Sequence, residues 1–111
     1  MSAEQRRIIF RLHRDHLYIH AAAYAANMTD LRTVALLRKG DDLHVTPLIG
    51  AEAGGYLIKQ INARGDRAIH AADFFRLNGV DDGREIFCEG EWSAATGSFV
   101  LLRLFAQLSL T

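Results

Sequence analysis

The sequence has little cysteine and little proline, and its charges cancel. One cysteine among 111 residues excludes an internal disulfide and a cysteine-rich zinc site. Thirteen basic residues balance thirteen acidic ones, so the net charge is zero. A zero net charge removes the global electrostatic argument for a nucleic-acid or anionic-membrane partner. Any such partner would have to be recognised through local segregation of charge.

Long apolar runs are also missing. No window approaches the roughly 18 apolar residues of a membrane span. The run Ile8-Ile9-Phe10 is interrupted at once by Arg11, so it does not form a signal-peptide core. We therefore expect a cytoplasmic protein with no membrane segment. Half of the residues are apolar, which predicts that residues 1–111 bury one core as a single domain.

The chain opens with the pattern of a hairpin followed by a helix. Residues that favour strands fill positions 6–12 and 17–20, and the polar segment 13–16 between them is typical of a turn. The alanine-rich segment 21–31 has the composition and spacing of a helix. A first hairpin and a short helix are therefore predicted.

A second hairpin is predicted after this helix. Segments 34–37 and 43–45 are its strands, and Gly40 lies in the turn between them, where a positive φ is needed. Pro47 indicates an edge or a strand end. The glycine-rich segment 51–55 has the composition of a flexible connector.

The second half of the chain repeats this order. Its predicted elements are strands at 56–61 and 67–70, a helix at 73–77, and strands at 84–91 and 99–104. The tail that follows is apolar enough to pack against the domain.

An offset of 50 positions brings the two halves into register. Residues 19–22 and 69–72 are both Ile-His-Ala-Ala, and seven pairs are identical from position 6 to position 41. The other identical pairs are Ile8 with Ile58, Arg14 with Arg64, and Gly40 with Gly90. Identity and element order agree, so we interpret the chain as two copies of a ββαββ unit, at about 6–49 and 56–104.

A unit of this size cannot easily bury its apolar faces by itself. We therefore expect the two copies to pair about a pseudo-twofold axis and to interleave into one closed barrel or sandwich of the α+β class. The competing interpretation is a single long helix over residues 3–28, because Ile8, Leu12 and Ile19 also roughly fit a helical stripe.

The second copy carries four short motifs in a fixed order. They are Arg64-Gly65-Asp66-Arg67, Ala68-Ile69, Leu77-Asn78-Gly79-Val80 and Asp81-Asp82-Gly83. In this order the segment resembles the swapped-hairpin DNA-binding domain of the AbrB/MazE family of bacterial transition-state regulators and antitoxins. Two such units in one chain are similar to the arrangement in MraZ-type proteins. The resemblance implies a pseudo-twofold swapped-hairpin β-barrel with two short helices, acting as a DNA-binding transcriptional regulator or antitoxin-like protein.

The resemblance also implies which residues contact double-stranded DNA, because the family uses its first hairpin and the turn of that hairpin. The DNA-binding candidates are Arg11, Arg14, Lys59, Arg64 and Arg67. Residues 6–16 contain four arginines against one aspartate, and residues 59–67 contain three bases against one aspartate. Acidic residues gather elsewhere, at Asp41, Asp42, Asp81, Asp82, Glu85, Glu89 and Glu91. A single positive face would result if both hairpins shared a side; the alternative is that these bases are solvated turn residues.

Other chemistry has little support in the sequence. There is no nucleophile elbow, phosphate-cradling glycine loop or paired-carboxylate motif, so we expect neither an enzyme nor a cofactor. The spacing of His13, His16 and His20 could suggest a metal site, but a strand and turn would point these side chains in different directions, and we predict none. His20 and His70 fall at equivalent helix entrances, where we expect structural roles; a pH-sensitive or metal-bridging pair is the alternative.

A second function class stays open beside DNA binding. The chain could be a protein-interaction or accessory module that does not bind DNA, with a second copy or another protein as its partner. Trp92 could anchor such a partner if exposed, or fold over the end of the barrel. Cys88 lies in a strand-like stretch and is interpreted as a structural thiol. The distribution of the five bases over the surface would distinguish the two classes.

Overall fold

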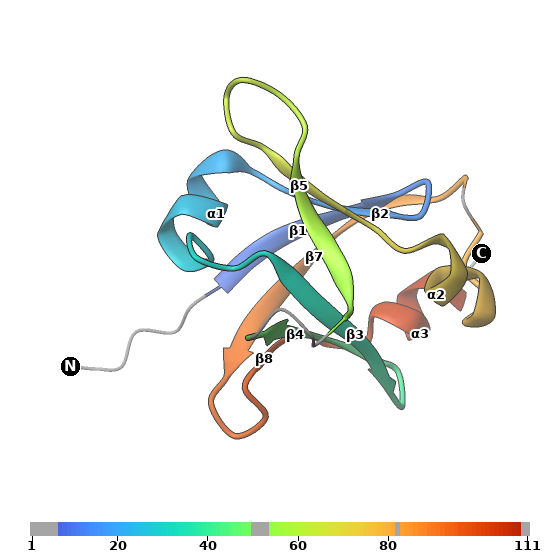
Figure 1. The fold of residues 1–111 in the computed structure, drawn as a ribbon. Helices are drawn as coiled ribbons and strands as arrows, with labels where there is room; N and C mark the ends of the chain where they lie inside the picture. Colours follow the sequence, from blue (N-terminus) through green and yellow to red (C-terminus); the bar gives the residue numbers. More distant parts are fainter. Residues whose placement is uncertain (1–6, 50–53, 82, 110–111) are drawn as a thin grey trace.

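Antiparallel strands close into an eight-stranded barrel in the part of the chain that the computed structural model describes, residues 7–49, 54–81 and 83–109 (Figure 1). The order around the barrel is β1 (Arg7–His13), β2 (His16–Ile19), β6 (Arg67–His70), β5 (Tyr56–Gln60), β3 (Thr33–Lys39), β4 (Asp42–Leu48), β8 (Ser98–Leu101) and β7 (Glu85–Ser93), which pairs with β1. Three short helices accompany the strands within these described ranges: α1 (Ala21–Asn27), α2 (Ala72–Leu77) and α3 (Leu104–Ser109). The predicted α+β class and closed barrel are confirmed.

Alternation of side chains along the strands builds the core. In β1, Ile8, Phe10 and Leu12 are buried, whereas Ile9 and Arg11 point to the outside. Residues of the other strands meet them inside the barrel; among these, Phe99 contacts Phe10 with ring centroids 6.4 Å apart. The alternative of a helix over residues 3–28 is wrong, since two strands, β1 and β2, lie within that segment. Alternation of buried and exposed residues favours strands over a helix here, because it buries one face of every strand.

Tight turns join the hairpins. Arg14 and Asp15 form the two-residue turn between β1 and β2, with φ of 51° and 66°. Positive φ at both positions matches the right-handed twist of the flanking strands. Gly40, in the turn between β3 and β4, has a φ of 63°, as the sequence predicted. Gly90 is not its counterpart, because Gly90 lies inside β7 with its Cα against the ring of Phe10.

The helices cover the two ends of the barrel (Figure 1). The first, α1, ends at Asn27, four residues earlier than predicted, with Met28 as its C-cap. At the other end, α2 buries Phe75, and its Phe74 ring lies 6.3 Å from that of Phe105 in α3. The sequence predicted a packing tail at α3 but no helix there. No helix in the described residues is long and apolar enough to cross a membrane.

A few predicted features fall outside the described residues. These are Arg6, Asp82, connector residues 51–53 and tail residues 110–111.

Candidate nucleic-acid interface

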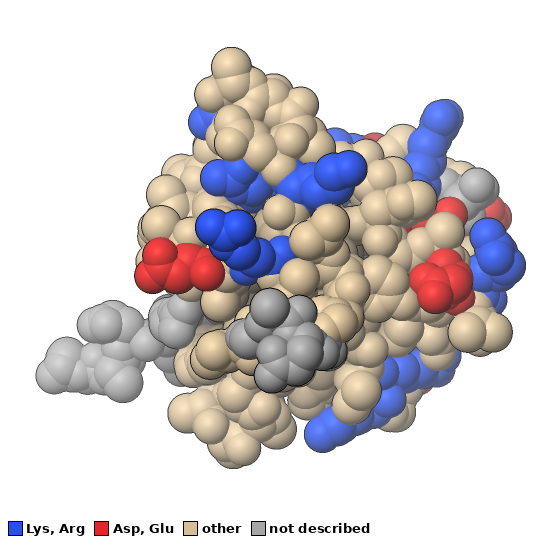
Figure 2. Space-filling model, viewed as in Figure 1, with Lys and Arg blue, Asp and Glu red and all other residues tan. Residues whose placement is uncertain are grey.

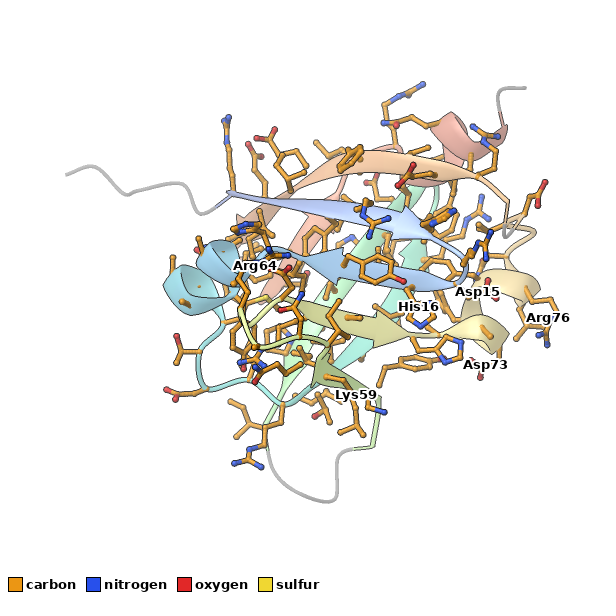
Figure 3. The ribbon with its side chains drawn as sticks, turned by 90° about the horizontal axis from the view of Figure 1, so that it is seen from above. Asp15, His16, Lys59, Arg64, Asp73 and Arg76 are labelled. Atoms are coloured by element: carbon orange, nitrogen blue, oxygen red, sulfur yellow. The ribbon has the colours of Figure 1, made fainter. Side chains whose placement is uncertain are left out.

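The two hairpins that carry the predicted DNA-binding residues are neighbours in the barrel. The β1–β2 hairpin meets the β5–β6 hairpin through pairing of β2 with β6, from His16 against His70 to Ile19 against Arg67. We call the outer surface of β1, β2, β6 and β5 the hairpin wall. Seen from above, these strands lie side by side, with Arg64, His16 and Lys59 over different parts of the wall (Figure 3).

The tips of the two hairpins lie at opposite ends of this wall. The β2–β6 register places Arg14 and its turn near His70, where α2 begins, and the loop containing Arg64 near Ile19, where α1 begins. The five predicted bases therefore do not converge on one point, and Arg67, which pairs with the core residue Ile19, lies on the inner side of the sheet. The other four are spread along the wall, with Lys59 on β5 opposite Ala68. Basic side chains gather over the region of α1 and β5, and acidic ones lie farther out on either side (Figure 2).

Arg11 is partly neutralised by a carboxylate from the neighbouring strand. Its Nη1 donates to Glu85 Oε2 at 2.9 Å, and its guanidinium carbon lies 4.2 Å from the centre of the Tyr18 ring. Ion pairing and stacking fix the guanidinium against the barrel. This arginine therefore contributes less free positive charge than the sequence suggested.

Arg64 is engaged within its own loop. Its Nη2 and Nε donate to Asp66 Oδ2 at 2.7 and 3.0 Å. Hydrogen bonds from Arg64, then from Asn62 and the backbone N–H of Ala21, hold the pKa of Asp66 far below its usual range. The carboxylate of Asp66 in turn raises the pKa of the Arg64 guanidinium. The loop is thus ordered by an internal charge pair.

Arg67 points to the inner side of the sheet at the end of the barrel that α1 covers, and neutral partners hold it there. Its guanidinium carbon lies 4.1 Å from the centre of the Tyr24 ring in α1, and its Nη1 donates to Gln60 Oε1 at 2.8 Å. Its buried Nε has no hydrogen-bond partner among the described residues. Arg32, an exposed base that the sequence analysis missed, lines the same surface pocket as Arg67 and Gln60. It lies outside both hairpins, so no local pattern singled it out.

Arg14 and Lys59 are the most available bases of the predicted set. Both are exposed, and no carboxylate in the described part of the chain forms an ion pair with either. The carbonyl of Arg14 is 2.7 Å from His16 Nδ1. A carbonyl can only accept, so His16 carries its proton on Nδ1 there. This bond adds order to the turn that presents Arg14.

A row of stacked side chains crosses the wall at its α2 end. The His16 ring lies 4.3 Å from that of His70 and 5.4 Å from that of Tyr18, nearly parallel to both. His20 does something different: it is the N-cap of α1, and its Nδ1 accepts from the N–H of Ala22. The predicted equivalence of His20 and His70 is therefore wrong in structural terms, because Ala71 is the N-cap of α2.

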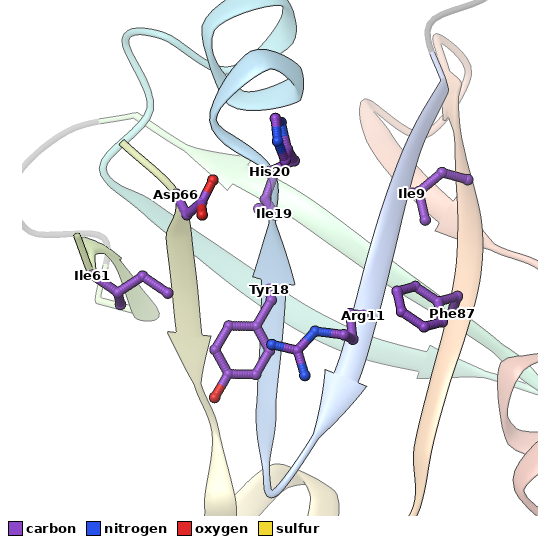
Figure 4. A pocket seen from close by; sticks show the side chains of 8 residues that line it. All are labelled: Ile9, Arg11, Tyr18, Ile19, His20, Ile61, Asp66 and Phe87. Atoms are coloured by element: carbon purple, nitrogen blue, oxygen red, sulfur yellow. The ribbon is translucent and has the colours of Figure 1, made fainter. Parts of the chain in front are cut away.

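A groove lies over β1 and β2, between Phe87 of β7 and the β5–β6 loop. Its volume is about 240 Å³, and the side chains that line it come from β7, β1, β2, the N-cap of α1 and the β5–β6 loop (Figure 4). Three of them are exposed apolar residues: Ile9 at 54%, Ile61 at 49% and Phe87 at 65%. Arg11 extends across the groove between Phe87 and Tyr18. No local pattern in the sequence predicts this groove.

Two other candidate groups have structural explanations. His44 Nδ1 lies 3.1 Å from Ser98 Oγ, the pairing of a base with a nucleophile, but Ser98 is fully buried and also bonds Thr96 Oγ1 at 2.8 Å. Substrate cannot reach it. Trp92 is half-buried, with its ring 4.9 Å from that of Phe99. In the described residues no group of three or more His, Cys, Asp or Glu side chains is placed to hold a metal ion.

Comparisons with protein-family models, with curated proteins and with solved structures found no match for this chain. Function is therefore inferred from the barrel, the hairpin wall and the groove on it.

Proposed function

We propose that this protein is a non-catalytic DNA-binding protein that contacts the phosphates of double-stranded DNA through the hairpin wall. The observation that carries this proposal is the charge of the two adjoining hairpins. Their described residues, 7–20 and 56–70, hold six bases against two acids, in a chain whose net charge is zero. Local segregation of this kind produces the positive potential that phosphate contacts require.

The architecture supports the resemblance to the AbrB/MazE and MraZ-type proteins. Each half of the chain contributes strands and a helix in the order ββαββ. The strands of the two halves correspond as β1 with β5, β2 with β6, β3 with β7 and β4 with β8. If every strand is exchanged with its counterpart, all strands that are neighbours in the barrel are still neighbours. This is the pairing that a pseudo-twofold, swapped-hairpin barrel would have. A role as a transcriptional regulator or antitoxin-like protein is part of the same proposal.

Within the wall, Arg14 and Lys59 are the main phosphate contacts that we propose. Their charges are exposed and have no acidic partner among the described residues, whereas Arg11 and Arg64 already form ion pairs. Arg67 adds charge from a fixed position at the α1 end. Contacts at both ends and in the middle would follow a DNA backbone along the wall.

The test is fluorescence anisotropy with a labelled DNA duplex of mixed sequence at several salt concentrations. The wild-type affinity should fall linearly on a log–log plot against salt concentration. The variants Arg14→Glu and Lys59→Glu should each weaken binding and lower the slope by about 1 or more. Lys39→Glu is the matched control, because Lys39 is also exposed but lies at the β3–β4 turn, away from the wall.

Three outcomes would overturn the proposal: no duplex binding at low salt, binding that does not depend on salt, or an equal loss of affinity in Lys39→Glu. The third outcome would mean that the net charge and not the wall controls binding. Circular dichroism of each variant would separate unfolding from loss of contacts.

The second candidate function is a protein-interaction module, and the groove beside Phe87 favours it. Exposed apolar residues that converge on a groove are typical of protein contact sites. This surface is distinct from the phosphate contacts at Arg14 and Lys59, so the two functions are compatible.

A further inference from the structure

The outer faces of β1 and β7 form a surface with a specific charge arrangement. Residues of β1 that point outward include Arg7, Ile9 and Arg11, and outward residues of β7 include Glu85, Phe87, Glu89 and Glu91. One strand is therefore basic and its neighbour acidic. Ile9 and Phe87, each more than half exposed, lie between the charged residues. We call this surface the β1–β7 face.

Ion pairs within the chain already join the bases of β1 to the acids of β7. Arg7 Nη2 is 3.0 Å from Glu91 Oε2, and Arg11 Nη1 is 2.9 Å from Glu85 Oε2. Exposed pairs of this kind contribute little to stability by themselves, since water screens them. The arrangement of these charges matters more for the choice of a docking partner. The face presents the bases of β1 and the acids of β7 around an apolar centre, and a partner with the complementary arrangement would fit it.

We propose that the occupant of the β1–β7 face is the same face of a second copy of this chain. A twofold axis that runs along the strands, between β1 and β7, lays each β1 over the partner's β7. The register then places Arg7 opposite the partner's Glu91 and Arg11 opposite the partner's Phe87. An axis across the strands would instead lay β1 over the partner's β1 and β7 over the partner's β7, so that strands of like charge face each other. Charge complementarity thus selects the first arrangement.

The groove provides the seat for the partner's aromatic ring. Arg11 and Tyr18 form part of it, and Ile9 and Ile61 lie on its two sides (Figure 4). A phenyl ring placed over Arg11 would contact the flat guanidinium and the neighbouring apolar side chains. Twofold symmetry makes the contact reciprocal, so two Phe87 rings become buried. This explains why a large apolar side chain that is 65% exposed lies beside an apolar groove.

The test is the mass of the full chain in solution without nucleic acid, measured by light scattering after size-exclusion chromatography over a range of concentrations. The expected mass is twice 12.4 kDa. Phe87→Glu should give the monomer. The matched control is Leu77→Glu, which changes an 86% exposed apolar residue on α2 and should leave the dimer intact.

A charge exchange tests the axis itself. Glu91→Arg places like charges opposite each other and should weaken the dimer, whereas the double variant Arg7→Glu with Glu91→Arg restores opposite charges and should recover it. Thermal melts identify any variant that fails to fold.

Four results would overturn the proposal: a monomer at all concentrations, a dimer insensitive to Phe87→Glu, higher oligomers, or loss of duplex binding in Phe87→Glu without a change of mass. The last would assign the face to DNA. The dimer and the DNA-binding proposal are tested by different variants. Lys59→Glu should weaken DNA binding and leave the mass of the dimer unchanged, so one proposal can fail without the other.

Discussion

The carboxylate of Asp66 accepts a hydrogen bond of 2.8 Å from the backbone N–H of Ala21, 45 residues earlier in the chain. Ala21 begins α1, and its N–H is one of the helix-end donors that have no partner within the helix. The next donor, Ala22 N–H, is satisfied by His20. The β5–β6 loop therefore caps a helix of the other half of the chain and places a negative charge at its N-terminus, where it is favoured.

Removal of the Asp66 carboxylate should destabilise the fold. Asp66→Ala leaves Ala21 N–H, Asn62 and Arg64 without their shared acceptor, so the melting temperature should fall. The pKa of Asp66 is lowered in the folded state, so its contribution is complete above the ordinary value of 3.8 and declines as the pH falls below it. The difference in melting temperature between Asp66→Ala and wild type should thus be constant near neutral pH and shrink in acid.

Thermal melts by circular dichroism between pH 7 and pH 2.5 would measure this difference. Asp30→Ala is the control, because Asp30 is exposed and has no hydrogen bond or ion pair to a described residue. An Asp66→Ala protein as stable as wild type at pH 7 would contradict the capping role.

A side chain at position 90 should not fit the barrel. A Cβ on Gly90 would lie 2.6 Å from Phe10 Cε1 and 3.2 Å from Leu101 Cδ1, both in the core. We therefore expect Gly90→Ala to lower the free energy of unfolding by about 1–3 kcal/mol, as overpacking of a core does. Urea denaturation measures it. Gly83→Ala should cost much less, because its nearest atom is an exposed carboxylate oxygen of Asp81 at 3.5 Å; equal costs would refute the steric explanation.

The thiol of Cys88 should react slowly in the folded protein. Burial and then the neighbouring charge of Glu89 raise its pKa, so less thiolate forms at a given pH. The residue is 7% exposed, which also restricts access of a reagent. Reaction with a chromogenic disulfide at pH 8 should be much slower in buffer than in urea. Equal rates in the two conditions would show that the thiol is accessible.

The hairpins could be predicted from the sequence because their information is local. Alternating side chains fix the strands of a hairpin, and Arg14-Asp15 and Gly40 supply turns of the required φ. The element order of both halves was predicted for the same reason. Boundaries were less certain: α1 was predicted to continue to Leu31, whose carbonyl accepts from the Tyr24 hydroxyl beyond the helix end.

Features that depend on distant contacts could not be predicted. A six-residue helix such as α3 has no stability by itself, and it forms because Phe105 packs under Arg38, 4.3 Å from its guanidinium carbon, and against Phe74. The partner of Arg11 is Glu85, 74 residues away. The sequence therefore identified the bases of the candidate site but not which of their charges are already paired.

This difference between paired and available bases gives the sharpest prediction for DNA binding. Arg64 gives its Nε and one terminal nitrogen to Asp66, whereas Arg14 has no acidic partner among the described residues. A phosphate would have to compete with Asp66 for Arg64 but would meet Arg14 directly. Arg14→Ala should therefore weaken duplex binding more, and lower the salt slope more, than Arg64→Ala. Anisotropy titrations of both variants in the same buffers compare them. If Arg64→Ala has the larger effect in a folded protein, the β5–β6 loop opens on binding, and the internal pair does not withdraw this base from the interface.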